Sequence, residues 1–274
     1  NIRVRYAHKP FTLDGISYER GTLIITDSDN KNLKNFNTIL TNASKNHNKN
    51  LTSTNTGFVE SGKDFGSGYV DVIQNLKIAV LSGEPTSTLR FGEIWNFFEQ
   101  QLNYPISVLN EDYFSRIDLT TYDILILPDG WGYKSFFSTH IKEKIKDWVK
   151  RGGKLIVMGG AIDALTASDK EKEIKKDSSN TISSFEVSER EQIKSAITGA
   201  IFKATVDNTN PLAYGYDNTY FTLKLGDRAY KYLENGSAVY LSAGANQPVS
   251  GFAGSEAKKK IAETLIFGTE EMGR

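Results

Sequence analysis

Short apolar runs alternate with amphipathic segments through the middle of the chain. Leu76 to Leu81, Tyr122 to Leu127 and Lys154 to Met158 are mainly apolar over their whole length, which is typical of strands buried on both faces. Ile106 to Leu109 predicts a further strand. Between these runs, apolar residues recur at helical spacing, in the stripes Ile94, Trp95, Phe98, Leu102 and Ile141, Ile145, Trp148, Val149. The alternation predicts an α/β domain over residues 76–274, with a doubly wound, mostly parallel sheet of the flavodoxin-like type.

Residues 1–75 predict a small N-terminal α/β extension. Phe11 to Leu13 and Gly21 to Thr26 are β-like runs. Apolar positions at helical spacing within Asn30 to Asn50 predict a helix, and Leu51 to Val59 predicts a following strand.

The C-terminal part has a weaker pattern. Residues 168–190 combine many Lys, Glu, Asp and Ser with few apolar groups, which predicts a charged surface insertion. Tyr220 to Leu225 and Ser237 to Leu241 predict strands near a sheet edge, and Ala257 to Ile266 predicts a closing helix.

Composition narrows the function classes. The 33 Lys and Arg balance the 33 Asp and Glu, so no overall field attracts nucleic acid or an anionic membrane surface. No apolar run approaches the roughly 18–20 residues that span a bilayer, so we expect no membrane span. The chain has no cysteine and only three histidines, which argues against a working thiol amidotransferase or zinc peptidase. Because it starts at Asn1 rather than at Met, we expect a piece of a longer protein.

Three loops follow predicted strands at the edge where an open α/β sheet binds ligands. The first two carry Glu84, Asp129 and Trp131, which together form a candidate pocket. Glu84 and Asp129 are placed for a general acid/base pair, although solvated loop acids are commoner. Trp131 is suited to the floor of a binding groove or, more commonly, to covering the sheet.

The third loop, Gly159-Gly160-Ala161, occupies the strand-to-helix turn where a nucleophile elbow exposes its Ser or Cys. No attacking atom stands there, so we predict a degenerate elbow and no catalytic residue. Backbone N–H groups at this turn are suited to an anion, but tight packing of helix on strand is the commoner reason for glycine.

His140 and Glu143 have the His-x-x-Glu spacing with which some zinc sites begin. No histidine follows His140, so the third protein ligand of a catalytic zinc is missing, and we expect no metal or other cofactor in this chain. The phosphate-loop, dinucleotide and Gly-x-Ser-x-Gly motifs are absent as well.

Four segments carry a family resemblance: Lys77 to Glu84, Gly92 to Leu102, Tyr122 to Gly130 and Gly152 to Ile156. Together they resemble the class I glutamine amidotransferase-like domain that follows the peptidase domain in large exported bacterial zinc carboxypeptidases of the M14 type. Further matches lie in Tyr18 to Ile25, Asp64 to Ser67 and Gly199 to Tyr216.

The resemblance implies the amidotransferase-like fold, a periplasmic or secreted location, and an upstream peptidase domain of the same polypeptide that holds the zinc. It does not imply the amidotransferase chemistry. Where amidotransferases keep a Cys, this sequence has Gly159 or Gly160, and no later histidine follows. Asn210 also stands before Pro211, where we expect a histidine in this stretch.

Three functions remain as hypotheses. The first is a non-catalytic accessory domain that packs on the carboxypeptidase domain or helps to recognise its substrate. The second is a binding module for a peptide or another small molecule, with its pocket at Glu84, Asp129, Trp131 and Gly160. The third is a carboxylate-dependent hydrolase that uses Glu84 and Asp129.

Overall fold

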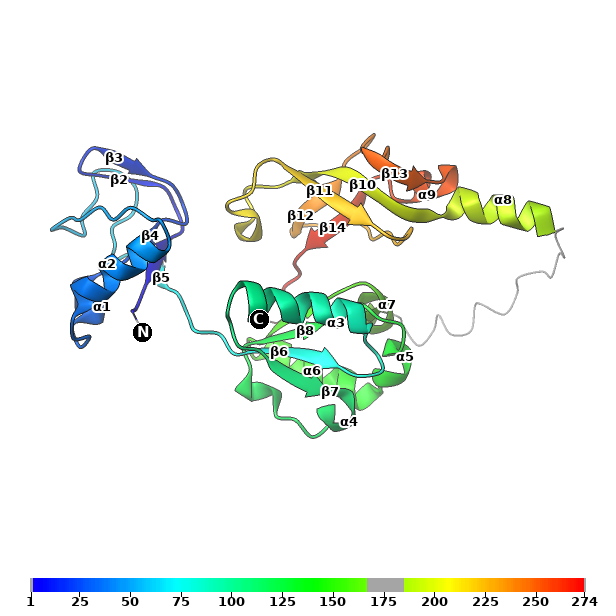
Figure 1. Ribbon diagram of the computed structural model, residues 1–274, viewed down its shortest axis with the longest axis horizontal. Coiled ribbons are helices and arrows are strands. Elements are labelled where there is room, and N and C mark those ends of the chain that lie inside the picture. Colours follow the sequence, from blue (N-terminus) through cyan, green and yellow to red (C-terminus); the bar gives the residue numbers. More distant parts are fainter. Residues whose placement is uncertain (1, 167–184, 274) are drawn as a thin grey trace. The chain divides into compact units, whose positions relative to one another are not determined.

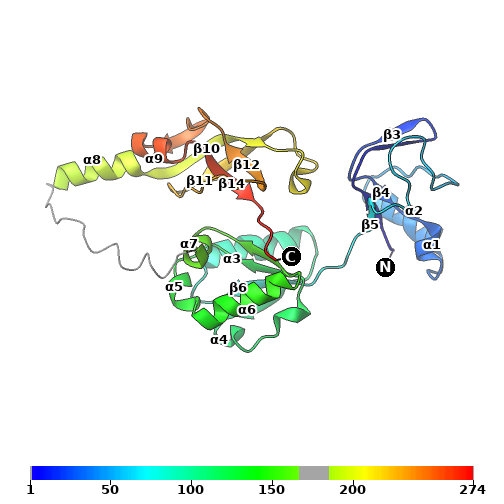
Figure 2. The same ribbon diagram turned by 180° about the vertical axis from the view of Figure 1, so that it is seen from behind.

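The computed structural model of the chain describes residues 2–166 and 185–273, which form two compact units (Figures 1 and 2). The first unit comprises residues 1–75 and 208–217, and the second comprises residues 76–207 and 218–274. The boundary between the two units therefore lies after Asn75, and the short later segment 208–217 also belongs to the first unit.

The first unit is built from small antiparallel sheets and two helices. Its elements are β1 (Arg5–Ala7), β2 (Phe11–Leu13), β3 (Ile16–Tyr18), β4 (Leu23–Ile24), α1 (Asp27–Asn30), α2 (Phe36–Asn46) and β5 (Val70–Val72). One sheet has the order β4-β1-β5, and β2 pairs with β3. The β2–β3 turn places Asp14 and Gly15 at φ 52° and 72°, as a two-residue hairpin turn requires.

Side-chain contacts tie β1 to α1 in this unit. Asp29 accepts hydrogen bonds from Arg5 Nε at 2.5 Å and from Arg5 Nη2 at 2.9 Å. This two-pronged pair, with a further bond from Thr26, holds the pKa of Asp29 well below its ordinary value. The helix predicted within Asn30 to Asn50 is confirmed as α2, with shorter bounds. The strand predicted over Leu51 to Val59 is wrong, because this stretch is an exposed loop.

The second unit begins with a parallel sheet. Its strands are β6 (Ile78–Ser82), β7 (Ser107–Asn110), β8 (Ile124–Leu127) and β9 (Lys154–Val157), in the order β7-β6-β8-β9. Its helices are α3 (Thr88–Trp95), a π-helix (Asn96–Gln101), α4 (Glu111–Phe114), a 3-10 turn (Leu119–Thr121), α5 (Tyr133–Phe136), α6 (Thr139–Lys150) and α7 (Gly160–Thr166). Each predicted strand of this region is confirmed within two residues of its expected ends.

Helices lie on both faces of the parallel sheet. Figure 1 shows α3 in front of the strands, and Figure 2, from behind, shows α6. Phe91, Ile94 and Phe98 pack on one face, against Val80 and Ile126. The other face packs under α5, α6 and α7 in a larger core of Ala79, Leu81, Leu125, Leu127, Tyr133, Phe136, Ile145, Trp148 and Ala161. Trp95 and Leu102, which the helical stripe predicted to be buried, are exposed at 39% and 53%.

The chain then forms a separate antiparallel sheet. Its elements are α8 (Phe185–Ser195), β10 (Ile197–Val206), β11 (Thr219–Lys224), β12 (Ser237–Leu241), β13 (Ser250–Ala253), α9 (Ser255–Lys260) and β14 (Thr264–Gly268), while a 3-10 turn (Pro211–Ala213) lies in the segment assigned to the first unit. The order is β11-β10-β12-β14, and β13 also pairs with β10. Phe202, Leu241 and Ile261 centre its core.

This second sheet overturns the predicted fold class. The chain is not one doubly wound, mostly parallel, flavodoxin-like domain, because in residues 2–166 and 185–273 only four strands are parallel and the others form separate antiparallel sheets. The reason is visible in β10, whose residues alternate between buried and exposed. Such alternation suits an antiparallel strand with one solvated face, and not a strand covered on both faces.

Two further expectations fall in the C-terminal part. The helix predicted over Ala257 to Ile266 is wrong beyond Lys260: Glu263 has φ 54°, and Thr264 starts β14. Of the insertion predicted near 168–190, residues 168–184 lie outside the described residues, and Phe185 starts helix α8. Among the described helices, none has both the length and the apolar character to cross a membrane.

Candidate functional site

The predicted elbow lies where β9 ends and α7 begins. Gly159 has φ +51°, in the left-handed region that favours glycine, and Gly160 is the first residue of α7. Ala161 is fully buried in the core beneath the helix. The backbone therefore makes the sharp turn that a nucleophile elbow needs, without a side chain at its tip.

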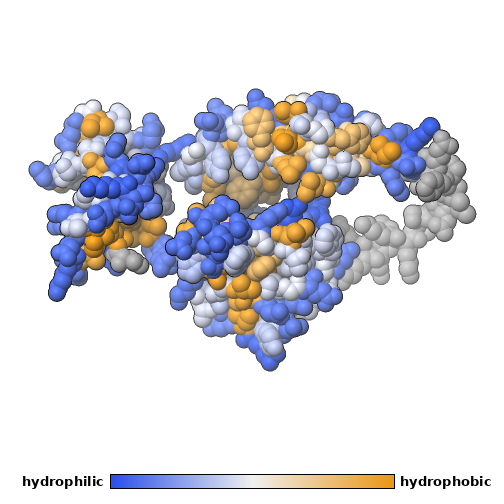
Figure 3. Space-filling view, viewed as in Figure 1, coloured by the Kyte–Doolittle hydropathy of each residue, from blue (hydrophilic) through white to orange (hydrophobic). Residues whose placement is uncertain are grey.

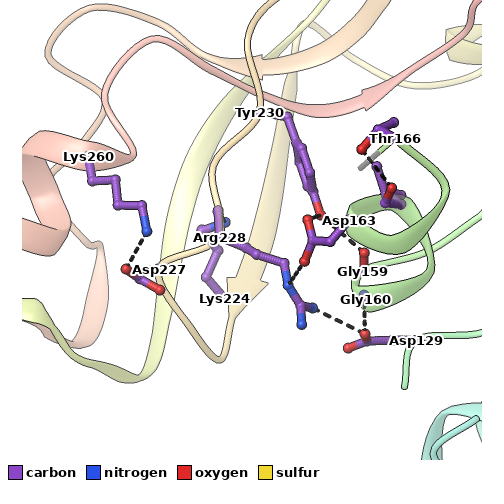
Figure 4. Close-up of polar contacts among 11 residues, drawn as sticks. Asp129, Gly159, Gly160, Asp163, Thr166, Lys224, Asp227, Arg228, Tyr230 and Lys260 are labelled. Atoms are coloured by element: carbon purple, nitrogen blue, oxygen red, sulfur yellow. Dashed lines mark hydrogen bonds and ion pairs between the residues drawn. The ribbon is translucent and has the colours of Figure 1, made fainter. Parts of the chain in front are cut away.

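Asp129, which follows β8, points at this turn. Its Oδ1 atom accepts a hydrogen bond of 2.6 Å from the backbone N–H of Gly160 and one of 3.1 Å from Arg228 Nη1 (Figure 4). A carboxylate of the chain itself thus occupies the position at the helix start where the sequence suggested an external anion.

Arg228 joins two carboxylates of the parallel-sheet region to the segment that follows β11. Its Nε atom lies 2.9 Å from Asp163 Oδ2 on α7, while its Nη1 atom binds Asp129. The hydroxyl of Tyr230 donates to Asp163 Oδ1 at 3.0 Å, and the carbonyl oxygen of Gly159 lies 3.1 Å from the same hydroxyl. We call Asp129, Gly160, Asp163, Arg228 and Tyr230 the elbow network.

Two carboxylates of the elbow network, those of Asp129 and Asp163, share the single guanidinium of Arg228. Burial by itself lowers the pKa of Arg228, but the nearby charges of Asp129 and Asp163 outweigh it, so the pKa is raised. Burial, together with the charge and hydrogen bond of Asp163, raises the pKa of Tyr230. Both groups therefore keep their protons at neutral pH.

Lys224 and Lys260 lie beside the network (Figure 4). Lys224 Nζ donates a hydrogen bond of 2.8 Å to the carbonyl oxygen of Arg228, and burial lowers its pKa. Lys260 pairs with Asp227 at 2.6 Å. These contacts fix the turn that presents Arg228.

No side chain fits at the tip of the elbow as it stands. A Cβ atom added to Gly159 would overlap the carboxylate of Asp129 and lie 2.8 Å from Arg228 Nη1. A Cβ atom added to Gly160 would overlap the carbonyl oxygen of Gly130. The space that a nucleophilic side chain would need is therefore filled by the elbow network and by backbone.

The other residues of the predicted pocket are not brought together with Asp129. Glu84 lies on an exposed loop, and Trp131 is 84% exposed. In the part of the chain that the structure describes, no hydrogen bond or ion pair joins Glu84 to Asp129. The loops meet through glycines instead, since a Cβ atom on Gly130 or Gly132 would lie within 3.0 Å of the backbone of residues 84–87.

His140 and Glu143 both lie on the exposed side of α6. Across residues 2–166 and 185–273, no cluster of three or more His, Cys, Asp or Glu side chains is arranged to hold a metal ion.

Asp163, Arg228 and Tyr230 were not predicted from the sequence. Arg228 lies 99 positions from Asp129, and no motif links the two segments. A weak signal was available for Asp163, because residues three and four positions apart share one helical face, so Asp163 lies one turn from Gly159 and Gly160.

Three comparisons with known proteins bear on this site. No family model, no curated protein and no solved structure matches the chain.

Proposed function

We propose that this chain is a non-catalytic accessory domain of a larger, exported protein with a zinc carboxypeptidase-like domain, against which it packs or for which it helps to recognise substrate. The zinc and the cleavage chemistry belong to that peptidase domain. The parent and its export rest on the family resemblance alone. The proposal of a non-catalytic role rests on one observation, the internally paired elbow network.

The network supports this role because its charged side chains pair with one another within the chain. A catalytic carboxylate needs a substrate proton within hydrogen-bond reach, whereas Asp129 binds Gly160 N–H and Arg228. A nucleophile needs an attacking atom at the elbow, and both tip positions are glycine. Active sites commonly retain strained or unsatisfied groups. At the elbow, by contrast, the carboxylates of Asp129 and Asp163 are paired with Arg228.

The same observation weighs against a hydrolase that uses Glu84 and Asp129. These two acids would have to share one water molecule, but Asp129 is committed to Arg228 and Gly160 while Glu84 lies on a separate exposed loop. For the ligand-binding alternative, the favourable features lie on the antiparallel sheet and not at the elbow.

Turnover assays test the non-catalytic role. The purified chain would be incubated with glutamine, peptide amides and esters, alongside Asp129→Asn and Glu84→Gln. We expect no turnover above the uncatalysed rate in any of them, and a lower unfolding midpoint for Asp129→Asn only. Turnover by the wild-type chain that both substitutions abolish would overturn the proposal.

The accessory role is tested in the full-length polypeptide. Deleting the whole chain, residues 1–274, from that polypeptide is expected to lower the stability or the kcat/KM of the attached peptidase domain, with its zinc content unchanged. A peptidase domain that is unaffected in both respects would contradict an accessory role.

A further inference from the structure

A shallow pocket opens on the solvated face of the antiparallel sheet. It has a volume of about 330 Å³ and is lined by Lys203, Thr205, Thr219, Ser242, Gly244 and Gln247, among others. This volume lies at the lower end of the roughly 300–1,000 Å³ of small-molecule sites. We call it the β10 pocket; it shares no residue with the elbow network and does not depend on the proposed function.

Strand register explains how the β10 pocket forms. Thr205 is paired with Thr219 across β10 and β11, and Lys203 is paired with Phe221. Because side chains alternate along a strand, Lys203 and Thr205 point to the opposite face from the buried Phe202 and Ala204. The turn after β12 then brings Ser242 within 3.5 Å of Thr205, oxygen to oxygen.

The polar groups of the β10 pocket are mainly hydrogen-bond donors. Lys203 carries an ammonium group, and among the described residues no hydrogen bond or ion pair engages it. The oxygen Oε1 of Gln247 already accepts a bond of 3.1 Å from Lys258, so its amide N–H groups are the part left to bind a ligand. None of the side chains that the structure places at the pocket is a carboxylate. This donor set matches a ligand oxyanion.

An apolar strip continues from the pocket along the same face of the sheet. Phe221 lies opposite Lys203, and Leu223 lies opposite Ile201. These three apolar side chains are exposed at 58%, 60% and 38%, in the order Phe221, Leu223 and Ile201. Figure 3 shows hydrophobic surface over this sheet. Exposed apolar groups gathered beside a polar pocket mark a ligand or interaction site more often than isolated ones do.

We propose that the β10 pocket binds an organic carboxylate with an adjacent apolar or aromatic group. The carboxylate accepts hydrogen bonds from Lys203, from the hydroxyls of Ser242 and Thr219, and from Gln247. The apolar group lies on Phe221 and Leu223. The same chemistry is offered by a free aryl acid and by the end of a peptide chain with an apolar last residue.

Calorimetric titration of the whole chain tests the proposal. The probes are N-acetyl-L-phenylalanine as a chain-end mimic, 3-phenylpropionate as a free acid, N-acetyl-L-phenylalaninamide as the uncharged counterpart, and inorganic phosphate. We expect both acids to bind saturably and more tightly than the amide and phosphate. Tighter binding of N-acetyl-L-phenylalanine indicates a chain end, and tighter binding of 3-phenylpropionate indicates a free acid.

Variants locate the binding. Lys203→Gln is expected to weaken the acids about tenfold, which is the effect of losing one hydrogen bond to a charged group. Phe221→Thr is expected to weaken the acids and to leave phosphate unchanged. Lys231→Gln, which removes an exposed charge elsewhere in the same region, is the matched control and should leave binding unchanged. Far-ultraviolet circular dichroism would check that each variant is folded.

Three results would overturn the proposal. Absence of saturable binding by both acids contradicts a built site. Equal binding of N-acetyl-L-phenylalanine and its amide contradicts carboxylate recognition. An equal loss of affinity in Lys203→Gln and Lys231→Gln would show that the acids are attracted to positive charge in general and are not bound in this pocket.

Discussion

The elbow network and the β10 pocket both gather polar side chains in the second unit, but they differ in how those side chains are satisfied. At the elbow, Asp129 and Asp163 are paired with Arg228. In the β10 pocket, Lys203 and its neighbouring hydroxyls face an open depression. A paired group stabilises the fold, whereas hydrogen-bond donors that face solvent are able to bind a ligand. Changes at the elbow should therefore alter stability, and changes at the pocket should alter ligand affinity.

Placing a thiol at the elbow should have the largest effect on stability. Gly160→Cys places a Cβ atom against the carbonyl oxygen of Gly130, and such overpacking costs roughly 1–3 kcal/mol. Chemical denaturation would measure the loss in the free energy of unfolding, and the thiol should still give no glutaminase activity.

Gly226→Cys is the matched control for this substitution. A Cβ atom there meets no other atom within 4 Å, so its free energy of unfolding should stay close to that of the wild type. Equal free energies of unfolding for Gly160→Cys and Gly226→Cys would show that the elbow has room for a side chain.

Removing the cation of the elbow network should have an intermediate effect. Arg228→Met leaves Asp129 and Asp163 without their shared partner, but the side chains of the three residues are 42%, 35% and 49% exposed. Solvent screening therefore limits the expected loss to about 1 kcal/mol, and the difference should shrink with added salt.

Lys146→Met on α6 is the control for Arg228→Met, because Lys146 is an exposed cation that forms no ion pair with any residue the structure describes. A loss for Arg228→Met no larger than that for Lys146→Met would show that the network does not stabilise the fold.

The sequence predicted the parallel sheet and the empty elbow because both depend on local patterns. Continuous apolar runs such as Tyr122 to Leu127 indicate buried strands without any knowledge of their partners. Gly159 and Gly160 directly follow a predicted strand, so the sequence alone places them at the strand-to-helix turn. Asp129 was singled out for the same local reason, as a polar residue directly after a buried strand.

The antiparallel sheet and the rest of the elbow network depend on contacts that no local pattern encodes. β10 begins with Ile197 and Thr198, and its pairing with β13 shifts register there. The shift interrupts the alternation of buried and exposed residues, so a short stretch of the sequence does not show the strand pattern. Arg228 lies 99 positions from Asp129 in the sequence, so their contact is a product of the tertiary fold. The apolar stretch after Lys260 was expected to continue as a helix, although pairing with β12 makes it a strand.

Alkaline pH should separate the contribution of Tyr230 from the rest of the network. Burial and Asp163 raise the pKa of Tyr230 above its ordinary value of about 10. A group whose pKa is raised on folding contributes stability that is present below the ordinary pKa and is lost as the pH rises toward the folded-state pKa. Tyr230→Phe should therefore lose less stability than the wild type between neutral pH and about pH 11.

Urea denaturation at neutral and alkaline pH would measure this difference. Lys224 titrates with the opposite sign, because burial lowers its pKa, so the comparison must be made between variant and wild type at each pH. Identical pH dependence in Tyr230→Phe and the wild type would place the hydroxyl in solvent and not in the network.

Substitutions in the β10 pocket should have the smallest effect on stability. Lys203 and Phe221 are exposed, and exposed residues away from special features usually change stability by no more than about 0.5 kcal/mol. Threonine at position 221 keeps a good strand former in β11, and glutamine at position 203 keeps most of the side-chain length. Denaturation midpoints of Lys203→Gln and Phe221→Thr should therefore match the wild type even where ligand binding is weakened. A loss of stability comparable to that of Arg228→Met would mean that the β10 pocket is held together as the elbow is, by contacts within the fold, and that its donors are not free for a ligand.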